Sequence, residues 1–428
     1  MRRLIYLLLL LLLATTIVAC GGNANEEISN AVGDAADEVA DVVDEPTSLE
    51  CDDPAGCVRV EPGEPIRIAS ALVISGPNAQ LGLDSQYGVE IAMDQRGEVL
   101  GHPIELQPED EGCNAEGGQT AAQKITSDPT IVGVIGTSCS GAGVPASQVM
   151  AAANYVMISP SNTAPVLTDP AEHQAGYFRT AHNDKVQGRA MAEYAFNELG
   201  VRSAAAIHDG DPYTEGLASV FRDSFIELGG EIVAFEASDP NATDVSPVLT
   251  TVAAGSPEFL YYPVFVVLGA NITQQARQVS GLEDTILAGA DGILSTDFLE
   301  AAGDAAIGMV LSGPDLGFEN QLYATFLEDY AEKYGGEPDS VFHGHAYDAT
   351  NILLGAVEEV AIQGDDGTLL IPRSALREAV GATANFEGIT GTLTCDEFGD
   401  CADPAISVSV VEEGDDGLEF VPVWSYEQ

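Results

Sequence analysis

Basic residues are scarce in this sequence. It has 15 lysines and arginines against 68 aspartates and glutamates, which gives a formal net charge of −53. Only three lysines are present, at positions 124, 185 and 333. Such a chain is repelled by nucleic acid and by anionic membrane surfaces, so we exclude both as partners. An excess of carboxylates keeps a surface hydrated in concentrated salt, which favours a source in a high-salt habitat.

Long hydrophobic runs are also missing beyond the first residues. Leu4 to Leu13 is almost pure leucine after a short basic start, but it is too short to cross a bilayer. This pattern predicts a secretory signal peptide over residues 1–19. The following stretch, Ile17 to Gly21, resembles the lipobox of bacterial lipoproteins, and this implies lipidation at Cys20. An ordinary signal peptide with a chance cysteine is the alternative. With no later spanning stretch, we expect attachment to the membrane through lipid alone.

No pair of cysteines has CxxC spacing. Six cysteines follow Cys20, and an even number in an exported chain indicates disulfides. Cys51 and Cys57 bracket one turn sequence, and Cys395 and Cys401 bracket another. Local pairing is the economical arrangement, and it leaves Cys113 with Cys139. The alternative is a zinc site, but no histidine lies near these cysteines, so we expect no metal.

Residues 20–63 contain few features of a folded domain. From Glu26 to Asp53 there are eleven acidic residues and no basic ones, which favours disorder. Ile28, Val32, Ala36 and Val39 have helical spacing, so a transient helix is compatible with the pattern. We therefore interpret residues 20–63 as an acidic tether.

From Pro65 onward, apolar runs and helical patterns alternate at short spacing. The predicted strands of the first series lie at 66–74, 102–110, 130–136 and 155–160; those of the second lie at 203–209, 230–236, 258–266 and 285–291. Such alternation predicts parallel sheets with helices on both faces. Two successive α/β series make two lobes. After Asn320 the pattern is helical, and the chain ends in a hairpin predicted around 389–411.

Ligands of open parallel sheets bind beyond the carboxyl ends of the strands, so the loops after strands are informative. The loop Gly136 to Ser140 lacks the second glycine of a nucleophile elbow, and no Asp/His pair completes a triad. It also lacks the lysine of a phosphate-binding loop. These absences argue against catalysis and against a phosphate ligand.

Hydroxyl groups and helix N-termini in two neighbouring loops suit a carboxylate instead. Ser140 and Thr163 lie in these loops of the first lobe. The second lobe offers Asp291 directly after a strand, together with Tyr213. One lobe for an anion and one for a cation describes an α-amino acid held across a cleft. The structural alternative is that these residues cap helices and turns.

Seven stretches in order resemble the substrate-binding subunits of branched-chain amino acid ABC transporters. They are "ISGPNAQLG", "VIGTSCS", "MISPSNTAP", "RTAHNDKVQG", "IHDGDPYTEG", "AGADG" and "HAYDATNIL". The resemblance runs from about Pro65 to about Asp400. It implies the type I periplasmic-binding-protein fold: two Rossmann-like α/β lobes with parallel central sheets, joined by a multi-strand hinge. It also implies lobe boundaries, with 64–182 and 315–391 in lobe 1 and 183–314 and 392–428 in lobe 2.

The resemblance assigns roles to individual residues. Ser140 and Thr163 would hold the ligand carboxylate with backbone contacts at Asn162, and Tyr213 and Asp291 would hold the ammonium. Phe265 would stand where the family often has a tyrosine, and Leu81 near a frequent aromatic. Family members pair two cysteines that match Cys113 and Cys139. Asp291 is one methylene shorter than the usual glutamate, which leaves the preferred side chain open. Arg179 and Asp184 lie at the crossover between lobes and are expected to steady it.

The resulting prediction is a monomeric, lipid-anchored, extracytoplasmic receptor without cofactor or catalysis. It would close on a branched-chain or other hydrophobic amino acid and deliver it to an ABC permease. A short amide or carboxylate ligand is one alternative, and a sensory receptor of the same fold is another. A lipoprotein hydrolase, which would need a reactive serine, and a purely structural surface lipoprotein are further alternatives.

Overall fold

The structure is a computed structural model, and it describes residues 49–318, 320–415 and 417–426. The chain divides into two units, Met1–Glu50 and Cys51–Gln428. The account below concerns the second unit. Cys20, the signal peptide and most of the predicted tether lie outside the described residues.

A six-stranded sheet forms the centre of what we call the first lobe. In spatial order its strands are β3 (Glu98–Val99), β4 (His102–Asp110), β2 (Ile66–Leu72), β5 (Ile131–Gly136), β6 (Met157–Ser159) and β7 (Tyr177–Arg179). All neighbours pair in parallel except β3 with β4. The helices of this lobe are α3 (Ala79–Arg96), α4 (Ala115–Thr126), α5 (Ser140–Ala152), η1 (Pro165–Thr168), α11 (Gln321–Tyr334), α12 (His343–Val360) and α13 (Arg373–Gly381).

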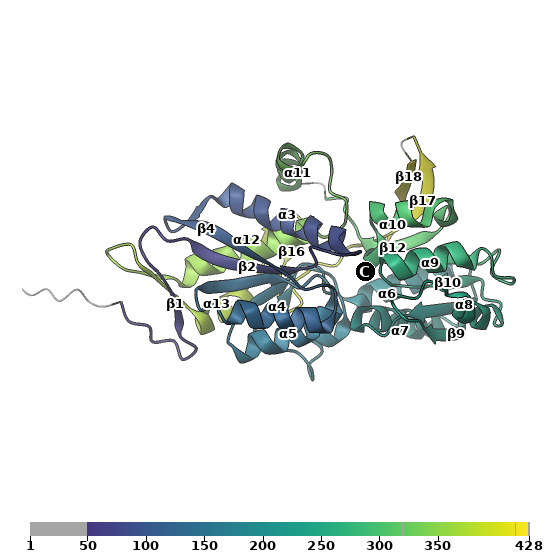
Figure 1. Cartoon of the computed structure of the whole chain (residues 1–428), viewed down its shortest axis with the longest axis horizontal. Helices are drawn as coiled ribbons and strands as arrows, with labels where there is room; N and C mark the ends of the chain where they lie inside the picture. The colour runs from purple at the N-terminus through teal and green to yellow at the C-terminus, as the bar shows by residue number, and fades with distance from the viewer. Residues whose placement is uncertain (1–48, 319, 416, 427–428) are drawn as a thin grey trace, which may run out of the picture. The chain divides into compact units, whose positions relative to one another are not determined.

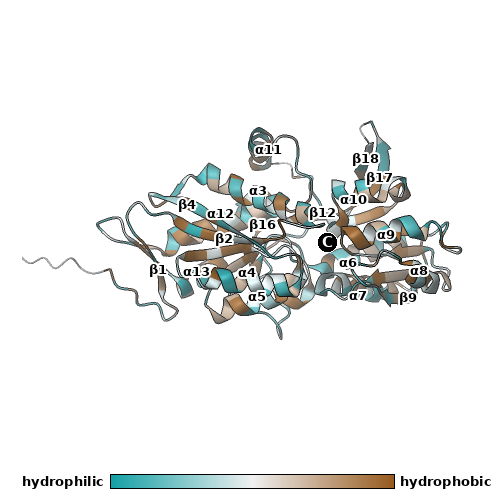
Figure 2. Cartoon of the chain, viewed as in Figure 1, coloured by the Kyte–Doolittle hydropathy of each residue, from teal (hydrophilic) through white to brown (hydrophobic). Residues whose placement is uncertain are grey.

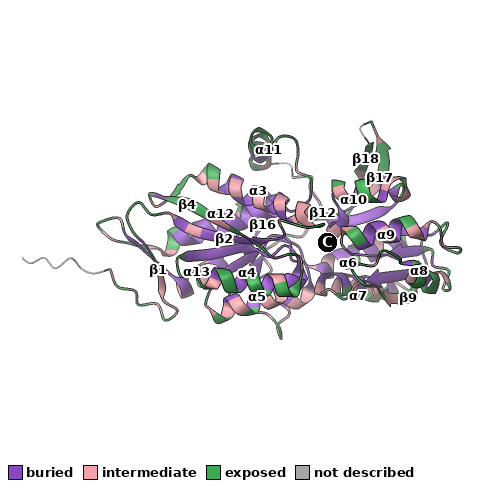
Figure 3. Cartoon of the chain, viewed as in Figure 1, coloured by how far each residue is buried: buried purple, intermediate pink, exposed green. Residues whose placement is uncertain are grey.

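Helices cover both faces of this sheet, as the uninterrupted apolar strands require. Along β2, Ile66 and Ile68 join a core with α3 and α12, whereas Ala69 and Ala71 join a core with α4 and α5. This alternation follows from the two-residue period of a strand. Figure 2 shows the apolar strands and Figure 3 shows that they are buried.

A seven-stranded sheet forms the centre of the second lobe. Its order is β18 (Gly417–Ser425), β17 (Ile406–Gly414), β12 (Val310–Pro314), β11 (Ile286–Gly289), β10 (Phe259–Tyr261), β8 (Ser203–His208) and β9 (Glu231–Ala237). The strands from β9 to β12 are parallel; β17 and β18 add an antiparallel hairpin. The helices are α6 (Asp184–Glu193), the π-helix η2 (Tyr194–Glu198), α7 (Pro212–Glu227), α8 (Ser246–Ala253), α9 (Val266–Ala276), η3 (Asp291–Ile293), α10 (Thr296–Ala302) and η4 (Gly303–Ala306).

The chain crosses between the two sheets three times. It leaves the first sheet after β7, returns after β12, and leaves again before β17 (Figure 1). Three crossings make a multi-strand hinge between two α/β lobes. No helix in the described part of the chain combines the length and apolar composition that a bilayer crossing needs.

Two local predictions differ from the structure. Residues 57–60, assigned to the tether, form β1 (Cys57–Val60), which pairs with β14 (Leu369–Pro372) beside β13 (Ile362–Gln363). Val58 and Val60 are buried in the first lobe, which offsets the cost of ordering this segment. The run predicted as a strand over 258–266 is a strand only at Phe259–Tyr261, since Pro263 cannot donate to a sheet.

The predicted terminal hairpin also takes a different form. A short hairpin of β15 (Phe386–Gly388) and β16 (Gly391–Leu393) precedes the Cys395–Cys401 disulfide loop. The longer hairpin of β17 and β18 then follows and reaches Ser425. The disulfide loop separates the two hairpins because its turn cannot continue a ladder.

Candidate ligand-binding cleft

Two loops of the first lobe leave adjacent parallel strands, β5 and β6, and bring Ser140 and Thr163 to one edge of the sheet. Ser140 is the first residue of α5, and its Oγ accepts a hydrogen bond of 3.2 Å from the Ala164 N–H. Thr163 is buried, and its Oγ1 has no hydrogen-bond partner among the described residues. The Thr163 side chain also lowers the pKa of the buried Asp184 carboxyl, so its hydroxyl lies close to that acid.

Asn162 joins these two loops. Its Nδ2 donates to the carbonyl groups of Thr137 and Ser138, both at 3.0 Å. Its backbone N–H donates to Ser159 Oγ at 2.8 Å. Because that N–H is already used inside the lobe, Asn162 is placed to shape the loops. The resemblance implied that the Asn162 backbone contacts the ligand carboxylate. The N–H of Asn162 is not free for this contact, because it already donates to Ser159 Oγ.

In the second lobe, Asp291 and Tyr213 lie against each other, although β10 lies between the strands β11 and β8 that precede them. The Tyr213 hydroxyl donates to Asp291 Oδ1 at 3.3 Å and accepts from the Gly292 N–H at 3.1 Å. Asp291 is only 5% exposed, and burial raises its pKa to about 6. A cationic group beside this carboxyl would favour its charged form.

Gln187 is a site residue that the sequence analysis missed. Its Nε2 donates to Asp291 Oδ1 at 2.6 Å and to the Ser312 carbonyl at 3.0 Å. His182 contacts the amide oxygen of Gln187 from the crossover strand. The quoted stretch "RTAHNDKVQG" contains both residues, but the contact of Gln187 with Asp291 spans more than a hundred positions and leaves no local pattern.

Asp184 is the second buried acid near this site. It is fully buried at the start of α6, and neither carboxylate oxygen has a hydrogen-bond partner among the described residues. Burial raises its pKa well above the ordinary value, and repulsion from Asp291 adds to this rise. Its backbone N–H donates to the Thr163 carbonyl at 3.0 Å, which ties the crossover to the first lobe. This bond agrees with the expected steadying role.

Arg179 steadies the same region from β7. Its guanidinium is fully buried and donates to the carbonyl groups of Asn162 and Ala164 at 3.1 and 2.9 Å. It also pairs with Asp400, which belongs to the Cys395–Cys401 loop. The third crossing of the hinge therefore holds the Thr163 loop in place through one arginine.

A cavity of about 670 Å³ is lined by residues of both lobes. Of the predicted site residues, Phe265 lines this cavity, whereas Ser140, Asn162, Thr163, Tyr213 and Asp291 do not. Gly141, Val144 and Pro145 come from the first lobe, and Asp211 and Phe265 from the second. The Phe265 ring lies 5.4 Å from the ring of Tyr213. Leu81 lines a much smaller hollow with Asp291 and packs against the core of the second lobe.

Another hollow of about 440 Å³ lies around Glu258 and Thr285. It sits before strands β10 and β11, at the amino end of the second sheet. None of the predicted site residues lines it, and parallel sheets bind ligands at the other end. We therefore place the candidate site in the larger cavity.

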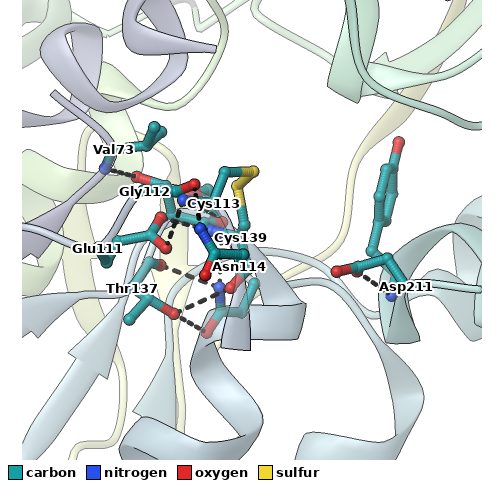
Figure 4. The surroundings of a disulfide bond; sticks show 12 residues. Val73, Glu111, Gly112, Cys113, Asn114, Thr137, Cys139 and Asp211 are labelled. Carbon is teal, nitrogen blue, oxygen red and sulfur yellow. Dashed lines mark hydrogen bonds between the residues drawn. A yellow bond between two sulfur atoms is a disulfide. The ribbon is translucent and has the colours of Figure 1, made fainter. Parts of the chain in front are cut away.

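The cavity is bordered by the Cys113–Cys139 disulfide. The structure contains the three disulfides expected from local pairing: Cys51–Cys57, Cys113–Cys139 and Cys395–Cys401. All six cysteines are thereby used, and none is left for zinc. Glu111 lies beneath the cavity disulfide and accepts from the N–H groups of both Cys113 and Cys139 (Figure 4).

Comparison with known families decides what kind of protein this is. The model of the periplasmic binding protein family matches residues 65–410. The chain belongs to the periplasmic binding protein family. Its members are extracytoplasmic solute-binding proteins that work with ABC transporters, and the two-lobed α/β fold is the fold of this family.

Several relatives in this family resemble the chain along most of its length. A Leu/Ile/Val-binding protein homolog of Brucella melitensis is 26% identical over 352 residues, which cover 82% of this chain and 92% of the relative. A leucine-, isoleucine-, valine-, threonine- and alanine-binding protein of Pseudomonas aeruginosa is 27% identical, with 78% and 87% covered.

Solved structures show the same likeness. The leucine-binding protein of Thermotoga maritima superposes with a TM-score of 0.74 at 26% identity, covering 84% of this chain and 98% of that one. A solute-binding protein of Rhodopseudomonas palustris in complex with benzoate has a TM-score of 0.70 at 21% identity, covering 84% and 97%. At this identity, the second likeness shows the fold alone.

Proposed function

We propose that this periplasmic binding protein binds a branched-chain or other hydrophobic α-amino acid in the cleft between its lobes. The observation that supports the proposal is that the first lobe offers groups suited to an anion, whereas the second lobe offers a carboxyl suited to a cation. Ser140 lies at the α5 N-terminus in one lobe, where unpaired backbone N–H groups favour an anion, and Asp291 supplies a buried carboxyl in the other. An α-amino acid carries both a carboxylate and an ammonium group.

The lining of the cavity supports an apolar side chain. Phe265, Val144, Val267 and four prolines line part of it, together with polar residues that include Asp209 and Asp211. Neither lysine nor arginine lines it. A carboxylate on the ligand side chain would find no cation there, which disfavours acidic amino acids. The names of the relatives from Brucella and Pseudomonas agree with this preference.

The cellular role follows from the family and from the N-terminal pattern. We propose that Cys20 is lipidated after removal of residues 1–19, and that the acidic segment after it tethers a monomeric receptor near an ABC permease. Nothing in this role needs a catalytic step, and we propose none. Cys20→Ser should release the protein from the membrane fraction of cells; retention there would contradict the lipid anchor.

Asp291→Ala tests the amino-acid site directly. Truncating a buried charged partner of the ligand should weaken L-leucine binding about 100-fold or more, measured by isothermal titration calorimetry. The exposed Asp304, in η4 of the same lobe, provides the control: Asp304→Ala should bind like the parent. Unchanged leucine affinity in Asp291→Ala would contradict the ammonium assignment.

A small carboxylate or amide is the second candidate ligand, because a relative of the same fold was solved with benzoate. A thermal-shift screen separates the candidates. A ligand at 100 times its Kd stabilises the fold by about 2.7 kcal/mol, which is readily detected. If benzoate or short amides stabilise the protein and hydrophobic amino acids do not, the amino-acid assignment is wrong.

A further inference from the structure

Gly141 and Asp211 meet across the cleft from opposite lobes. Gly141 is the second residue of α5, and Asp211 precedes α7. A Cβ placed on Gly141 would lie 1.9 Å from Asp211 Oδ2 and 3.3 Å from Oδ1. The carboxylate therefore rests on the bare α-carbon of Gly141, and any larger residue would separate the two lobes at this point. In Figure 4, Asp211 lies to the right, apart from the Cys113–Cys139 disulfide.

The two oxygens of Asp211 have different surroundings. Oδ1 accepts from the Tyr213 N–H at 2.9 Å and caps α7 within the second lobe. Oδ2 faces the N-terminus of α5 in the first lobe, where unpaired N–H groups favour negative charge. Burial raises the pKa of this carboxyl to about 6, while the N–H groups of Tyr213 and Gly141 act to lower it. One side chain thus serves both lobes.

A second contact between the lobes lies at the N-terminus of α3. Gln80 Nε2 donates to Thr296 Oγ1 at 3.0 Å, and Gln80 Oε1 accepts from the Asp297 N–H at 3.3 Å. Leu81 packs beside it against the second lobe. Contacts on α3 and on α5 therefore join the lobes at two separate places.

We propose that Asp211 is a closure residue: by docking on the Gly141 end of α5, it stabilises the closed form of the protein and slows ligand release. The contact exists only when the lobes meet, so it shifts the open–closed equilibrium toward closure. A receptor whose closed form is already populated loses less affinity to the conformational change. Only the ligand readout below rests on the proposed function.

Two variants test this proposal: one adds a methyl group at the contact, and the other removes the carboxylate from it. Gly141→Ala places a methyl group where the carboxylate lies, and alanine suits a helix better than glycine, so the helix itself is preserved. Asp211→Ser keeps an N-cap for α7 but is too short to reach Gly141. L-leucine affinity should fall about tenfold in Gly141→Ala, with faster dissociation, and by a smaller factor in Asp211→Ser.

The double variant distinguishes a shared contact from two unrelated defects. In Asp211→Ser, the methyl of Gly141→Ala has room, so the double variant should bind no worse than Asp211→Ser alone. Gly355→Ala in α12 is the control, because nothing lies within 4 Å of that Cβ. Additive losses, or wild-type affinity in Gly141→Ala, would overturn the proposal.

Small-angle scattering of the unliganded proteins gives a readout without ligand. Gly141→Ala should have a larger radius of gyration than the parent and than the double variant. If all three have the same radius, the closure role is wrong. If the parent binds no amino acid but the radii differ as expected, the proposed ligand fails while the closure residue stands.

Discussion

The carboxyl group of Glu111 accepts hydrogen bonds from the backbone of both cysteines in the cavity disulfide. Oε2 accepts from the Cys113 N–H at 3.0 Å and Oε1 from the Cys139 N–H at 3.2 Å. Despite these two donors, burial raises the pKa of Glu111 to about 8. At neutral pH the folded protein therefore holds a proton there that the unfolded chain releases.

This proton predicts a pH dependence of stability. Because the pKa is higher in the folded state, the stability contributed by Glu111 is greatest below its unfolded pKa of about 4.5 and declines as pH rises toward 8. The full decline is on the order of 5 kcal/mol. Glu111→Gln should flatten the dependence of the unfolding free energy between pH 5 and 8, as measured by urea denaturation. A profile as steep as that of the parent would contradict the assignment.

The site residues show how far single positions can be read from sequence. Asp291 and Ser140 were predicted because each lies in a loop after a buried strand, and the ligand site of a parallel sheet lies at that end of its strands. Their role in ligand binding stays a prediction. Gln187 and Asp211 were not singled out, since their importance comes from contacts with segments far away in the chain.

At the scale of elements, α4 and α5 pack unusually closely on one face of the first sheet. A Cβ on Gly118 of α4 would lie 2.3 Å from the Ala142 carbonyl oxygen of α5. This approach leaves no room for a side chain between the two helices. The glycine is therefore required by packing, although it weakens α4 by about 1 kcal/mol relative to alanine.

Gly118→Ala should destabilise the protein for this reason. Overpacking of a tight core contact costs about 1–3 kcal/mol, which outweighs the gain in helix propensity. The change should appear as a lower denaturation midpoint with an unchanged slope. At Gly355 in α12, nothing lies within 4 Å of an added Cβ. Gly355→Ala should therefore raise the denaturation midpoint instead. A rise in both variants would contradict the close approach.

Elements were predicted best where one pattern dominates a long stretch. The strand predicted at 102–110 is β4 (His102–Asp110) with the same bounds. The run at 258–266 was read as one strand because its apolar residues continue past Tyr261. Pro263 and the start of α9 at Val266 end the strand early, and composition alone does not separate a buried strand from the loop that follows it.

At the scale of the whole molecule, 68 acidic residues repel one another with few basic residues to compensate. We expect chloride salts to stabilise the fold, because screening reduces this repulsion more in the compact state than in the unfolded chain. The melting temperature should rise by roughly 2–4 °C for every kcal/mol regained between 0.1 and 2 M sodium chloride. Sucrose is excluded from the protein surface but does not screen charges, so a melting curve in sucrose serves as the comparison. A melting temperature indifferent to sodium chloride would contradict this expectation.

The sequence by itself determined the α/β class and the two series of strands, because these depend on local periodicity. It predicted the cysteine pairs from economy of spacing, and the structure contains these pairs. It also placed Ser140, Thr163, Tyr213 and Asp291 after strands. Only the tertiary structure decided that Gln187 bonds Asp291 and that Asp211 rests on Gly141. Such contacts join segments separated by tens to hundreds of residues, and their geometry exists only after both lobes have folded and met.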